Sequence, residues 1–254
     1  MEEMIKYIVQ NNIGILYLNR PEKRNALHPE MVRQIKDKLR EIENDDDVKV
    51  LIITGEGKAF CSGADLEYLN QLREYSSLEN EKDSRELAEM FLMIYKFSKP
   101  VVAAVQGAAI AGGCGLASVC DFIVAHPEDS KFGYTEVKIG FIPAIVSIFL
   151  IKKMGEGNAN HLLLSGAIIN GKRAYEINLA NYLSYNVLET SLEISYQLAT
   201  YSSGSLSETK KMIKSISDMP VEKAVELCLE LNTISRSTED FKKGLNNFLN
   251  KSGK

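Results

Sequence analysis

The sequence predicts an α/β protein, in which buried strands alternate with helices before a helical C-terminal part. Two nearly all-apolar runs, VKVLIITG at 48–55 and PVVAAVQG at 100–107, have the composition of strands buried on both faces. Apolar residues at helical spacing separate the two runs. Such alternation predicts parallel strands joined by right-handed crossovers. From about Gly155 onward the strand signal fades, and helical patterns take its place.

The chain begins with the pattern of a β-hairpin. β-rich runs at 4–9 and 13–19 lie on either side of Asn11-Asn12, a dipeptide that suits a tight turn. The charged stretch RPEKRNAL then ends the strand pattern. Pro29 fits the first turn of a helix. The apolar side chains of that helix recur at helical spacing, at Met31, Ile35, Leu39 and Ile42.

The middle and the end of the chain carry longer helical patterns. Residues 73–86 are polar and charged, so we expect a mobile excursion there. A helix over residues 87–97 follows and leads into the second buried strand. Four amphipathic helices make up the C-terminal part, over 190–202, 205–216, 220–234 and 238–250.

Length and composition argue against several classes of function. A chain of 254 residues suits one large domain or a domain with an appendage. A net charge of −4 without a long basic stripe argues against nucleic acid as a partner. Four cysteines without a C-x-x-C pair argue against zinc and predict reduced thiols in the cytoplasm. Because no apolar run approaches the ~20 residues that span a bilayer, we expect no membrane partner.

Two glycine-bearing turns, each between a buried strand and a helix, are the strongest functional signal. They are GKAFCSGADL, after the strand at 48–54, and GAAIAGGCGL, after the strand at 100–105. Ligands of α/β sheets bind beyond the carboxyl ends of strands, where helix N-termini offer free N–H groups. Two such turns side by side can aim two donors at one oxygen, each worth ~3–4 kcal/mol when charge develops there. Tight packing of helix against strand explains Gly112-Gly113 equally well.

At these turns the sequence resembles the crotonase superfamily of enoyl-CoA hydratases and isomerases. The matching segments are LNRPEKRNAL, KAFCSGADL, KPVVAAVQGAAIAGGCGLASVCDF, FGYTEVKIGFIP and STEDFKKGLNNFL. They occur in the order and at the spacing of that superfamily and cover essentially the whole chain. The resemblance implies a spiral of ββα units with the acyl-CoA site over residues 1–190, and a helical trimerisation region over residues 191–254.

The resemblance also implies a substrate and an assembly. Members act on acyl-CoA thioesters, so coenzyme A is part of the substrate, and we expect no separate cofactor and no metal. The implied assembly is a homotrimer or a dimer of trimers. The two backbone donors to the thioester carbonyl correspond to Ala64 and Gly112, and the catalytic carboxylate corresponds to Glu136. Without the resemblance, a glutamate in a first helical turn is more often a partner of the helix dipole.

Further positions correspond to substrate and coenzyme A contacts in the superfamily. They are Lys23, Arg24, Ala26, Ala59, Phe60, Asp65, Gly113, Gly115, Phe241 and Lys242, with Tyr134 and Phe141 in the acyl pocket. Lys23 and Arg24 fit solvated surface charge as well, and Phe60 fits core packing. Asp65 also suits the cap of the helix that it opens. Phe241 and Lys242 correspond to residues that close the coenzyme A site, in the same chain or in a neighbouring subunit.

Gly115 departs from the pattern of the superfamily's two-carboxylate hydratases. Those enzymes have a glutamate where this chain has Gly115, and a second one at the position of Glu136. An oxyanion hole with one carboxylate suffices for proton transfer next to a thioester, and simple isomerases of the superfamily similarly keep only the second glutamate. The alternatives are therefore a Δ3-Δ2-enoyl-CoA isomerase using Glu136 alone, a crotonase-like decarboxylase and a non-catalytic acyl-CoA-binding protein.

A finer resemblance favours hydration. The segment FGYTEVKIGFIPAIVSIFLIKKMGE is similar to a bacterial branch of 3-methylglutaconyl-CoA hydratase-like proteins of leucine breakdown, which also carry a small residue at the position of Gly115. These proteins have alanine and valine after the proline, as in Pro143-Ala144-Ile145-Val146, where common hydratases have a glycine-rich run. We therefore predict an acyl-CoA hydro-lyase that acts on a 2-enoyl-CoA, with 3-methylglutaconyl-CoA as the expected substrate.

Overall fold

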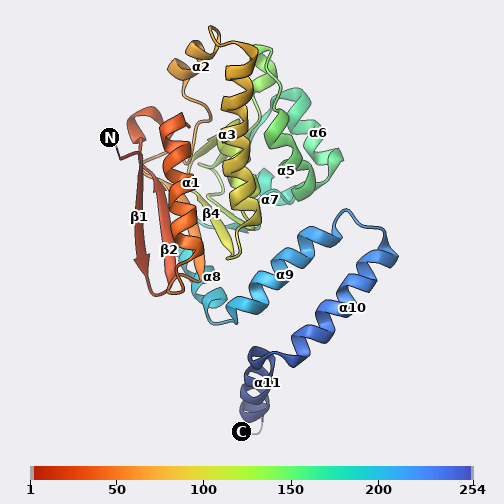
Figure 1. The fold of residues 1–254 in the computed structure, drawn as a ribbon. Helices are drawn as coiled ribbons and strands as arrows, with labels where there is room; N and C mark the ends of the chain where they lie inside the picture. The colour runs from red at the N-terminus through yellow and green to blue at the C-terminus, as the bar shows by residue number, and fades with distance from the viewer. Residues whose placement is uncertain (1–2, 253–254) are drawn as a thin grey trace.

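The computed structural model describes residues 3–252, which form two β-sheets covered by helices (Figure 1). The larger sheet has the order β1-β2-β3-β4-β6-β9 and the smaller one the order β5-β7-β8. The strands are β1 (Ile5–Gln10), β2 (Ile13–Leu18), β3 (Val50–Gly55), β4 (Val101–Val105), β5 (Ala108–Ile110), β6 (Phe122–Ala125), β7 (Lys131–Gly133), β8 (Ile168–Asn170) and β9 (Tyr182–Leu183). The helices are α1 (Pro29–Glu43), α2 (Leu66–Leu72), α3 (Ser77–Lys96), α4 (Gly112–Val119), α5 (Ala144–Met154), α6 (Glu156–Ser165), α7 (Gly171–Glu176), α8 (Val187–Ala199), α9 (Ser203–Ile216), α10 (Val221–Ser237) and α11 (Glu239–Ser252), with 3₁₀ helices η1 (Pro21–Lys23) and η2 (Glu136–Ile139).

The predicted hairpin and the predicted parallel strands are both confirmed. β1 and β2 pair antiparallel, and β2, β3, β4, β6 and β9 pair in parallel. The hairpin turn has φ angles of 48° at Asn11 and 66° at Asn12. Positive φ at both central residues is the geometry of the turn that matches the twist of a two-residue hairpin, and asparagine tolerates it well.

Both faces of β3 and β4 are buried, as their apolar composition predicts. Alternate residues, Leu51, Ile53, Val101 and Ala103, belong to the main core with α1, α3 and α4. The residues between them, Val50, Ile52, Val102 and Ala104, belong to a second core against α8. Figure 1 shows α1 and α3 lying across one side of the larger sheet, so the sheet is the middle layer of the molecule.

The mobile excursion expected over residues 73–86 is wrong for most of that range, because α3 begins at Ser77. The Ser76 hydroxyl accepts from the Glu79 N–H, and the Glu79 carboxylate accepts from the Ser76 N–H, which makes a capping box. Lys36 of α1 pairs with Glu86 and Glu89 at 2.8 and 2.7 Å and ties the polar half of α3 to the core. Charge pairing and a cap therefore stabilise a helix that few apolar residues mark.

Two short strands lie in the region where the sequence shows no strand signal. β8 has three residues and pairs antiparallel with β7, and β9 has two residues and extends the larger sheet beside β6. Strands of this length are too short to show alternation of apolar and polar residues. Their pairing is set by the neighbouring strands and not by their own composition.

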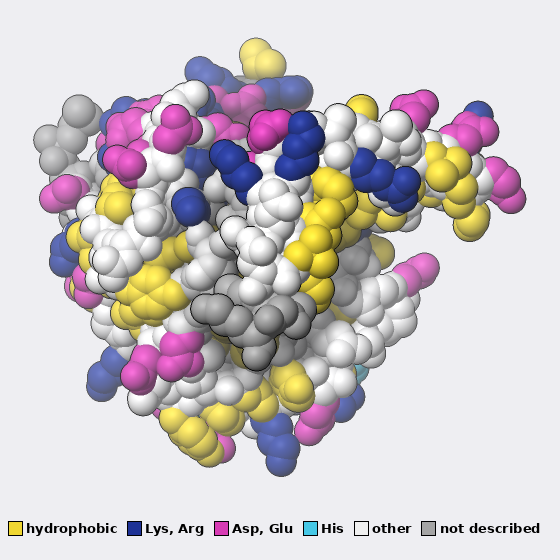
Figure 2. Space-filling view, turned by 90° about the horizontal axis from the view of Figure 1, so that it is seen from below, with side chains coloured by type: hydrophobic (Ala, Val, Ile, Leu, Met, Phe, Trp, Pro, Cys, Tyr) yellow, Lys and Arg dark blue, Asp and Glu magenta, His cyan; other side chains and the backbone are white. Residues whose placement is uncertain are grey.

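The last three helices project from the core as an arm, which we define as α9, α10 and α11 (Figure 1). No residue of α9 or α10 is buried. Exposed apolar side chains follow the arm, among them Val221, Leu229, Ile234 and Phe248, and Figure 2 shows hydrophobic side chains on the projecting part. Two ion pairs tie α9 to the core, from Lys210 and Lys214 to Asp121 at 2.5 and 3.6 Å. The predicted boundary at residue 190 falls inside α8, which packs on the sheet.

The described residues contain neither a helix that could span a membrane nor a cluster of metal-binding side chains. Within residues 3–252, no helix combines the length and the apolar composition that a bilayer span requires. Over the same residues, the side chains of His, Cys, Asp and Glu form no group that could hold a metal ion.

Candidate active site

The two glycine-bearing turns lie side by side. Cys61 of the first turn pairs with Ala109 of the second in a parallel bridge, held by backbone hydrogen bonds of 2.9 and 3.0 Å. Three residues further along the two segments come Ala64 and Gly112. A Cβ atom on Gly63 would lie 3.6 Å from the Gly112 nitrogen, so the backbones are in close contact there. The structure brings the two predicted donor residues together.

The backbone N–H groups of Ala64 and Gly112 have no acceptor within residues 3–252. Gly112 is the first residue of α4, and its N–H is one of the four that a helix leaves without an internal partner. Ala64 precedes Asp65, which is the N-cap of α2. Two free donors at neighbouring helix starts can stabilise negative charge that develops on one oxygen.

Close backbone contact holds the second turn. Ala111 has φ 50° and ψ −121°, a conformation that residues with a side chain rarely adopt. The Ala111 N–H donates to the Gly133 carbonyl at 2.7 Å, which fixes this turn against β7. A Cβ atom on Gly113 would lie 2.0 Å from the Cys61 carbonyl oxygen. Glycine is therefore required at 113, and this packing is the role that the sequence left as an alternative.

Polar side chains hold the first turn. The buried Arg20 guanidinium donates to the Asp65 carboxylate and to the Ala26 carbonyl, both at 2.9 Å. The Asn25 side chain accepts from the Arg20 N–H at 2.9 Å and donates to the Ala59 carbonyl at 2.8 Å. Asp65 also accepts from two amides of α2, which is the capping role predicted from the sequence. The Asp65 carboxylate is buried and already bonded to these protein groups. A contact between Asp65 and the substrate stays a prediction.

Glu136 opens η2, three residues after Gly133, and so follows directly on the strand that anchors the second turn. Its Oε2 atom is buried and has no hydrogen-bond partner within the described residues. Burial raises the pKa of Glu136, because it disfavours the charged form of the carboxyl. A half-buried carboxyl with one unpartnered oxygen is suited to exchange a proton with a ligand.

The side-chain space at Gly115 is filled by a valine. A Cβ atom at position 115 would lie 2.2 Å from Cγ1 of Val146 and 3.6 Å from the ring of Phe91. Val146 belongs to α5 and is 5% exposed. Gly115 is therefore a packing residue of this fold, and the wall beside it is apolar.

Tyr134 and Cys114 form part of the wall between β7 and α4. Tyr134 is fully buried, and its hydroxyl lies 3.0 Å from the Ser118 hydroxyl. Burial raises the pKa of the Cys114 thiol to about 12, so this thiol stays protonated and unreactive near neutral pH. The predicted contact of Tyr134 with the acyl chain stays a prediction.

Comparison with known proteins identifies the family. The model of the family described as enoyl-CoA hydratase/isomerase matches residues 9–254. The chain belongs to the enoyl-CoA hydratase/isomerase family. It is 37% identical over 246 residues to a Thermus thermophilus protein provisionally named an enoyl-CoA hydratase, covering 96% of this chain and 97% of that one. It is 31% identical over 245 residues to the 2,3-dehydroadipyl-CoA hydratase of Escherichia coli, covering 95% and 94%.

Solved structures confirm the fold. A Shewanella pealeana enoyl-CoA hydratase superposes with a TM-score of 0.94 at 26% identity, over 98% of this chain and 94% of that one. The α/β crotonase-like fold predicted from the sequence is therefore correct. This member of the enoyl-CoA hydratase/isomerase family is an enzyme of the hydratase type, consistent with an acyl-CoA substrate.

The predicted coenzyme A residues surround the first turn of this family member. Lys23 is exposed and pairs with Glu67 at 2.6 Å. Arg24 ends η1 with a left-handed φ of 52°. Three smaller or apolar positions, Ala26, Ala59 and Phe60, are buried. Contacts between these residues and coenzyme A stay predictions, and the buried Phe60 has the core-packing role that the sequence left open.

Three predicted residues lie away from the paired turns or outside the core. Phe141 follows η2 and is 60% exposed, beside the exposed Ile142. Phe241 and Lys242 belong to α11, the last helix of the arm, which lies at the opposite end of the molecule from α2 (Figure 1). Within one chain, the structure does not bring these two residues to the Ala64 turn, and Lys242 pairs with Glu239 at 2.7 Å.

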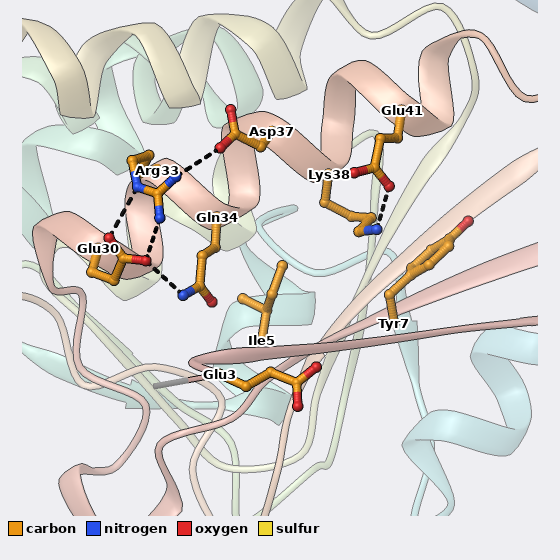
Figure 3. Close-up of a pocket in the computed structure, with 9 residues that line it drawn as sticks. All are labelled: Glu3, Ile5, Tyr7, Glu30, Arg33, Gln34, Asp37, Lys38 and Glu41. Carbon is orange, nitrogen blue, oxygen red and sulfur yellow. Dashed lines mark hydrogen bonds and ion pairs between the residues drawn. The ribbon is translucent and has the colours of Figure 1, made fainter. Parts of the chain in front are cut away.

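A hollow of about 430 Å³ lies elsewhere, between β1 and α1 (Figure 3). Most of its charged side chains pair with one another: Arg33 with Glu30 and Asp37, and Lys38 with Glu41. None of the predicted site residues lines it. Because the hollow is open and contains none of the predicted site residues, the paired turns remain the candidate active site.

Sequence reasoning missed three residues that shape the site. Arg20 and Ala111 lie inside the quoted motifs, but their roles depend on partners that the fold supplies. Val146 lies in the segment that differs from the common hydratases, and Gly115 is the position that departs from the two-carboxylate pattern. The sequence marks both positions as unusual, but only the fold shows that they are in contact.

Proposed function

We propose that this enzyme adds water to the double bond of a 2-enoyl-CoA, with Ala64 and Gly112 as donors to the thioester oxygen and Glu136 as the single acid/base. The unpartnered, buried Oε2 of Glu136 carries this proposal. The free amides at two adjoining turns support the assignment of the oxyanion hole. The hydratase names of the relatives support the reaction type.

The reaction balances with one carboxylate. The water oxygen bonds to C3 while Glu136 takes its proton, and the electron pair moves through the double bond onto the thioester oxygen. The two amides stabilise the resulting enolate, which is the species of highest energy. Glu136 then returns the proton to C2, and the thioester carbonyl re-forms. The raised pKa of Glu136 suits a group that holds a proton between these two steps.

We propose 3-methylglutaconyl-CoA as the substrate within this class. The support is the segment around Glu136 and Val146, which is similar to the corresponding branch of the superfamily. In that substrate a carboxylate at the far end of the acyl chain offers a second polar group to a bound water. Such a group would take the place of the glutamate that Gly115 replaces.

A second candidate is Δ3-Δ2-enoyl-CoA isomerisation, which the Val146 contact favours. Because Val146 fills the space beside Gly115, the wall there offers no group to hold a water. In this reaction Glu136 removes a proton from C2 of a 3-enoyl-CoA, and the same proton returns to C4. No water is consumed, so one carboxylate and a dry wall suffice.

An assay with three substrates separates the candidates. Crotonyl-CoA, 3-methylglutaconyl-CoA and 3-hexenoyl-CoA are each incubated with the enzyme in ¹⁸O-labelled water, and the products are analysed by mass spectrometry. Hydration predicts labelled 3-hydroxyacyl products and fastest turnover of 3-methylglutaconyl-CoA. Turnover of 3-hexenoyl-CoA without incorporation of solvent oxygen would replace hydration with isomerisation.

The variant Glu136→Gln tests the acid/base role. It keeps the shape of the side chain, so we expect folding and CoA binding to persist while turnover falls at least ~100-fold, the usual scale for a positioned acid/base. Near-normal turnover would return Glu136 to the role of a helix-dipole partner and remove the proposed mechanism.

We propose that the chain assembles as a homotrimer or a dimer of trimers through its arm. The support is the run of exposed apolar side chains on α10 and α11, because contiguous exposed apolar patches mark interaction sites. Light scattering at micromolar concentration measures the mass directly. A monomeric mass would contradict the proposal.

We further propose a cytoplasmic location. Cys61, Cys114, Cys120 and Cys228 are all free, and three of them are buried. Reduced thiols in an enzyme of this size suit a reducing compartment. Fractionation with detection by antibody tests the proposal, and recovery in a membrane or extracellular fraction would overturn it.

A further inference from the structure

We propose that Arg20 is a positioning residue that orients and polarises the Ala64 amide through two linked peptide groups. The proposal deepens the proposed function and rests on it, because it takes Ala64 as a donor to the thioester oxygen. Arg20 does not need to touch the substrate. It acts at one end of a chain of hydrogen bonds whose other end is the free N–H of Ala64.

The first link joins Arg20 to the peptide between Ala26 and Leu27. The guanidinium donates to the Ala26 carbonyl at 2.9 Å. The N–H on the other side of the same peptide belongs to Leu27. A positive donor on a carbonyl draws electron density from the amide and strengthens the N–H of that peptide as a donor.

The second link joins this peptide to the one that carries the Ala64 amide. The Leu27 N–H donates to the Gly63 carbonyl at 2.7 Å. The Gly63 carbonyl and the Ala64 N–H belong to one planar peptide and point in opposite directions. Fixing that carbonyl therefore fixes the direction of the Ala64 N–H, and the polarisation passes to it in the same way.

The guanidinium itself is held rigidly. Its second nitrogen donates to the Asp65 carboxylate at 2.9 Å, and the side chains of this pair are 9% and 5% exposed. Asp65 follows Ala64, and its own backbone N–H donates a further hydrogen bond to the Leu27 carbonyl at 3.0 Å. The Ala64 amide is thus bracketed by two contacts with Leu27. The Gly112 amide lacks a comparable charged group in the described residues, because backbone packing positions its turn.

The test compares Arg20→Met and Arg20→Lys with the control Lys36→Met. Lys36 is also a buried cation with carboxylate partners, but it joins α1 to α3 and has no part in the chain of bonds. The readouts are kcat, KM for the enzyme's best enoyl-CoA, and the infrared stretching frequency of the ¹³C-labelled thioester carbonyl of bound butyryl-CoA. A saturated acyl-CoA is used so that the probe binds without reacting. Cooperative unfolding of each variant is checked first.

We expect binding to wild-type enzyme to lower the carbonyl frequency, and Arg20→Met to lose at least about half of that shift. We expect kcat to fall about tenfold with KM changed less than threefold, since removing an oxyanion donor outright costs 10²–10³. Arg20→Lys keeps the charge but lacks the planar fork that places one nitrogen on each acceptor, so we expect an intermediate effect, and this variant serves as the test if Arg20→Met does not fold. Lys36→Met keeps the wild-type shift and kcat.

The outcomes separate the two proposals. A wild-type enzyme that does not shift the butyryl-CoA carbonyl contradicts the oxyanion hole itself. If the wild type and a folded Arg20 variant lower the carbonyl frequency of butyryl-CoA equally, the proposed role of Arg20 is wrong. The assignment of the oxyanion hole is then unaffected. Equal losses in the Arg20 variants and in Lys36→Met would mean that both act only through stability, which also overturns it.

Discussion

The two turns that meet at the candidate active site are built by different physical means. Side-chain hydrogen bonds and a buried ion pair hold the turn at Ala64. Backbone contact, a strained φ at Ala111 and a glycine at 113 hold the turn at Gly112. The first turn therefore depends on charge and responds to solvent conditions, whereas the second depends on volume. Loss of a polar group should therefore act on the Ala64 turn, whereas added volume should act where the Gly112 turn contacts the Cys61 backbone.

The largest loss of stability is expected for Gly113→Ala, which adds a methyl group to the turn that depends on close backbone packing. The added methyl would lie 2.0 Å from the Cys61 carbonyl oxygen, and no side-chain rotation can relieve a contact with backbone. We expect the free energy of unfolding to fall by about 3 kcal/mol and turnover to be largely lost. Denaturant unfolding and the enoyl-CoA assay measure both.

Gly157→Ala is the matched control for that variant. Gly157 is helical, and nothing lies within 4 Å of a Cβ at this position. Alanine in place of glycine in a helix is favourable by up to ~1 kcal/mol, so this variant should be as stable as the wild type or slightly more stable. Equal damage by the two substitutions would contradict the steric account of the second turn.

A slightly smaller effect is expected when Gly115→Glu is combined with Val146→Gly. Alone, Gly115→Glu pushes a side chain into Val146 and buries a charge, at a cost of about 2–3 kcal/mol. With Val146→Gly in the same chain, we expect part of this cost to be recovered, with a coupling of at least ~1 kcal/mol in a double-mutant cycle. Additive effects would show that the two side chains do not compete for one space.

Asn25→Ala is the corresponding attack on the polar turn, with an expected loss of about 2 kcal/mol. It removes bonds to the Glu56 and Ala59 carbonyls and to the Arg20 N–H and leaves buried groups unpaired. Asn25 also has φ 55°, which asparagine tolerates better than alanine. Denaturant unfolding measures the loss, and a change within ±0.5 kcal/mol would show that the network is not structural.

Acid should distinguish the turns through Asp65. Burial alone raises the pKa of Asp65, but hydrogen bonds from Arg20 and from the Tyr68 and Glu67 amides outweigh it, and the pKa is lowered from 3.8. This stabilisation is present above pH 3.8 and is lost as the pH falls through the lowered folded-state pKa. We expect the destabilisation by Asp65→Asn to shrink in acid, while that of Gly113→Ala stays constant. Denaturant unfolding at several pH values measures both losses of stability. If the two losses change with pH in the same way, the two turns do not differ in their dependence on charge.

The smallest effect is expected for Ala111→Gly. Glycine adopts φ 50° with ψ −121° without strain, whereas alanine does not. Relief of strain is partly offset by the greater freedom of glycine in the unfolded chain, so we expect a gain of at most about 1 kcal/mol. Thermal unfolding measures it, and a loss of stability would show that the alanine methyl contributes packing that outweighs the strain.

The sequence predicted the elements whose signals are local. The hairpin at Asn11-Asn12, the buried strands β3 and β4 and the helix after Pro29 follow from turn chemistry, composition and periodicity. The first turns of α3 were missed although Ser76 and Glu79 form a capping box, because charge pairing with α1 stabilises that polar segment.

The site residues that the sequence does not predict depend on contacts between distant parts of the chain. Arg20 and Asp65 are 45 residues apart in the chain and meet only in the fold. The pattern around Gly115 indicated a missing carboxylate but not the valine that fills its place. A motif covers one continuous stretch of sequence, so it does not predict a contact between residues that are far apart in the chain.

The arm gives the molecule a stability that is not the same everywhere. Because α9 and α10 bury no residue in their own chain, whatever covers their apolar faces supplies most of their folding free energy. If a second copy covers them, each tenfold rise in protein concentration adds up to ~1.4 kcal/mol to the protection of these helices. The rate of amide hydrogen exchange in α10 would then depend on protein concentration. Exchange would be fast at nanomolar concentration and slow at high concentration.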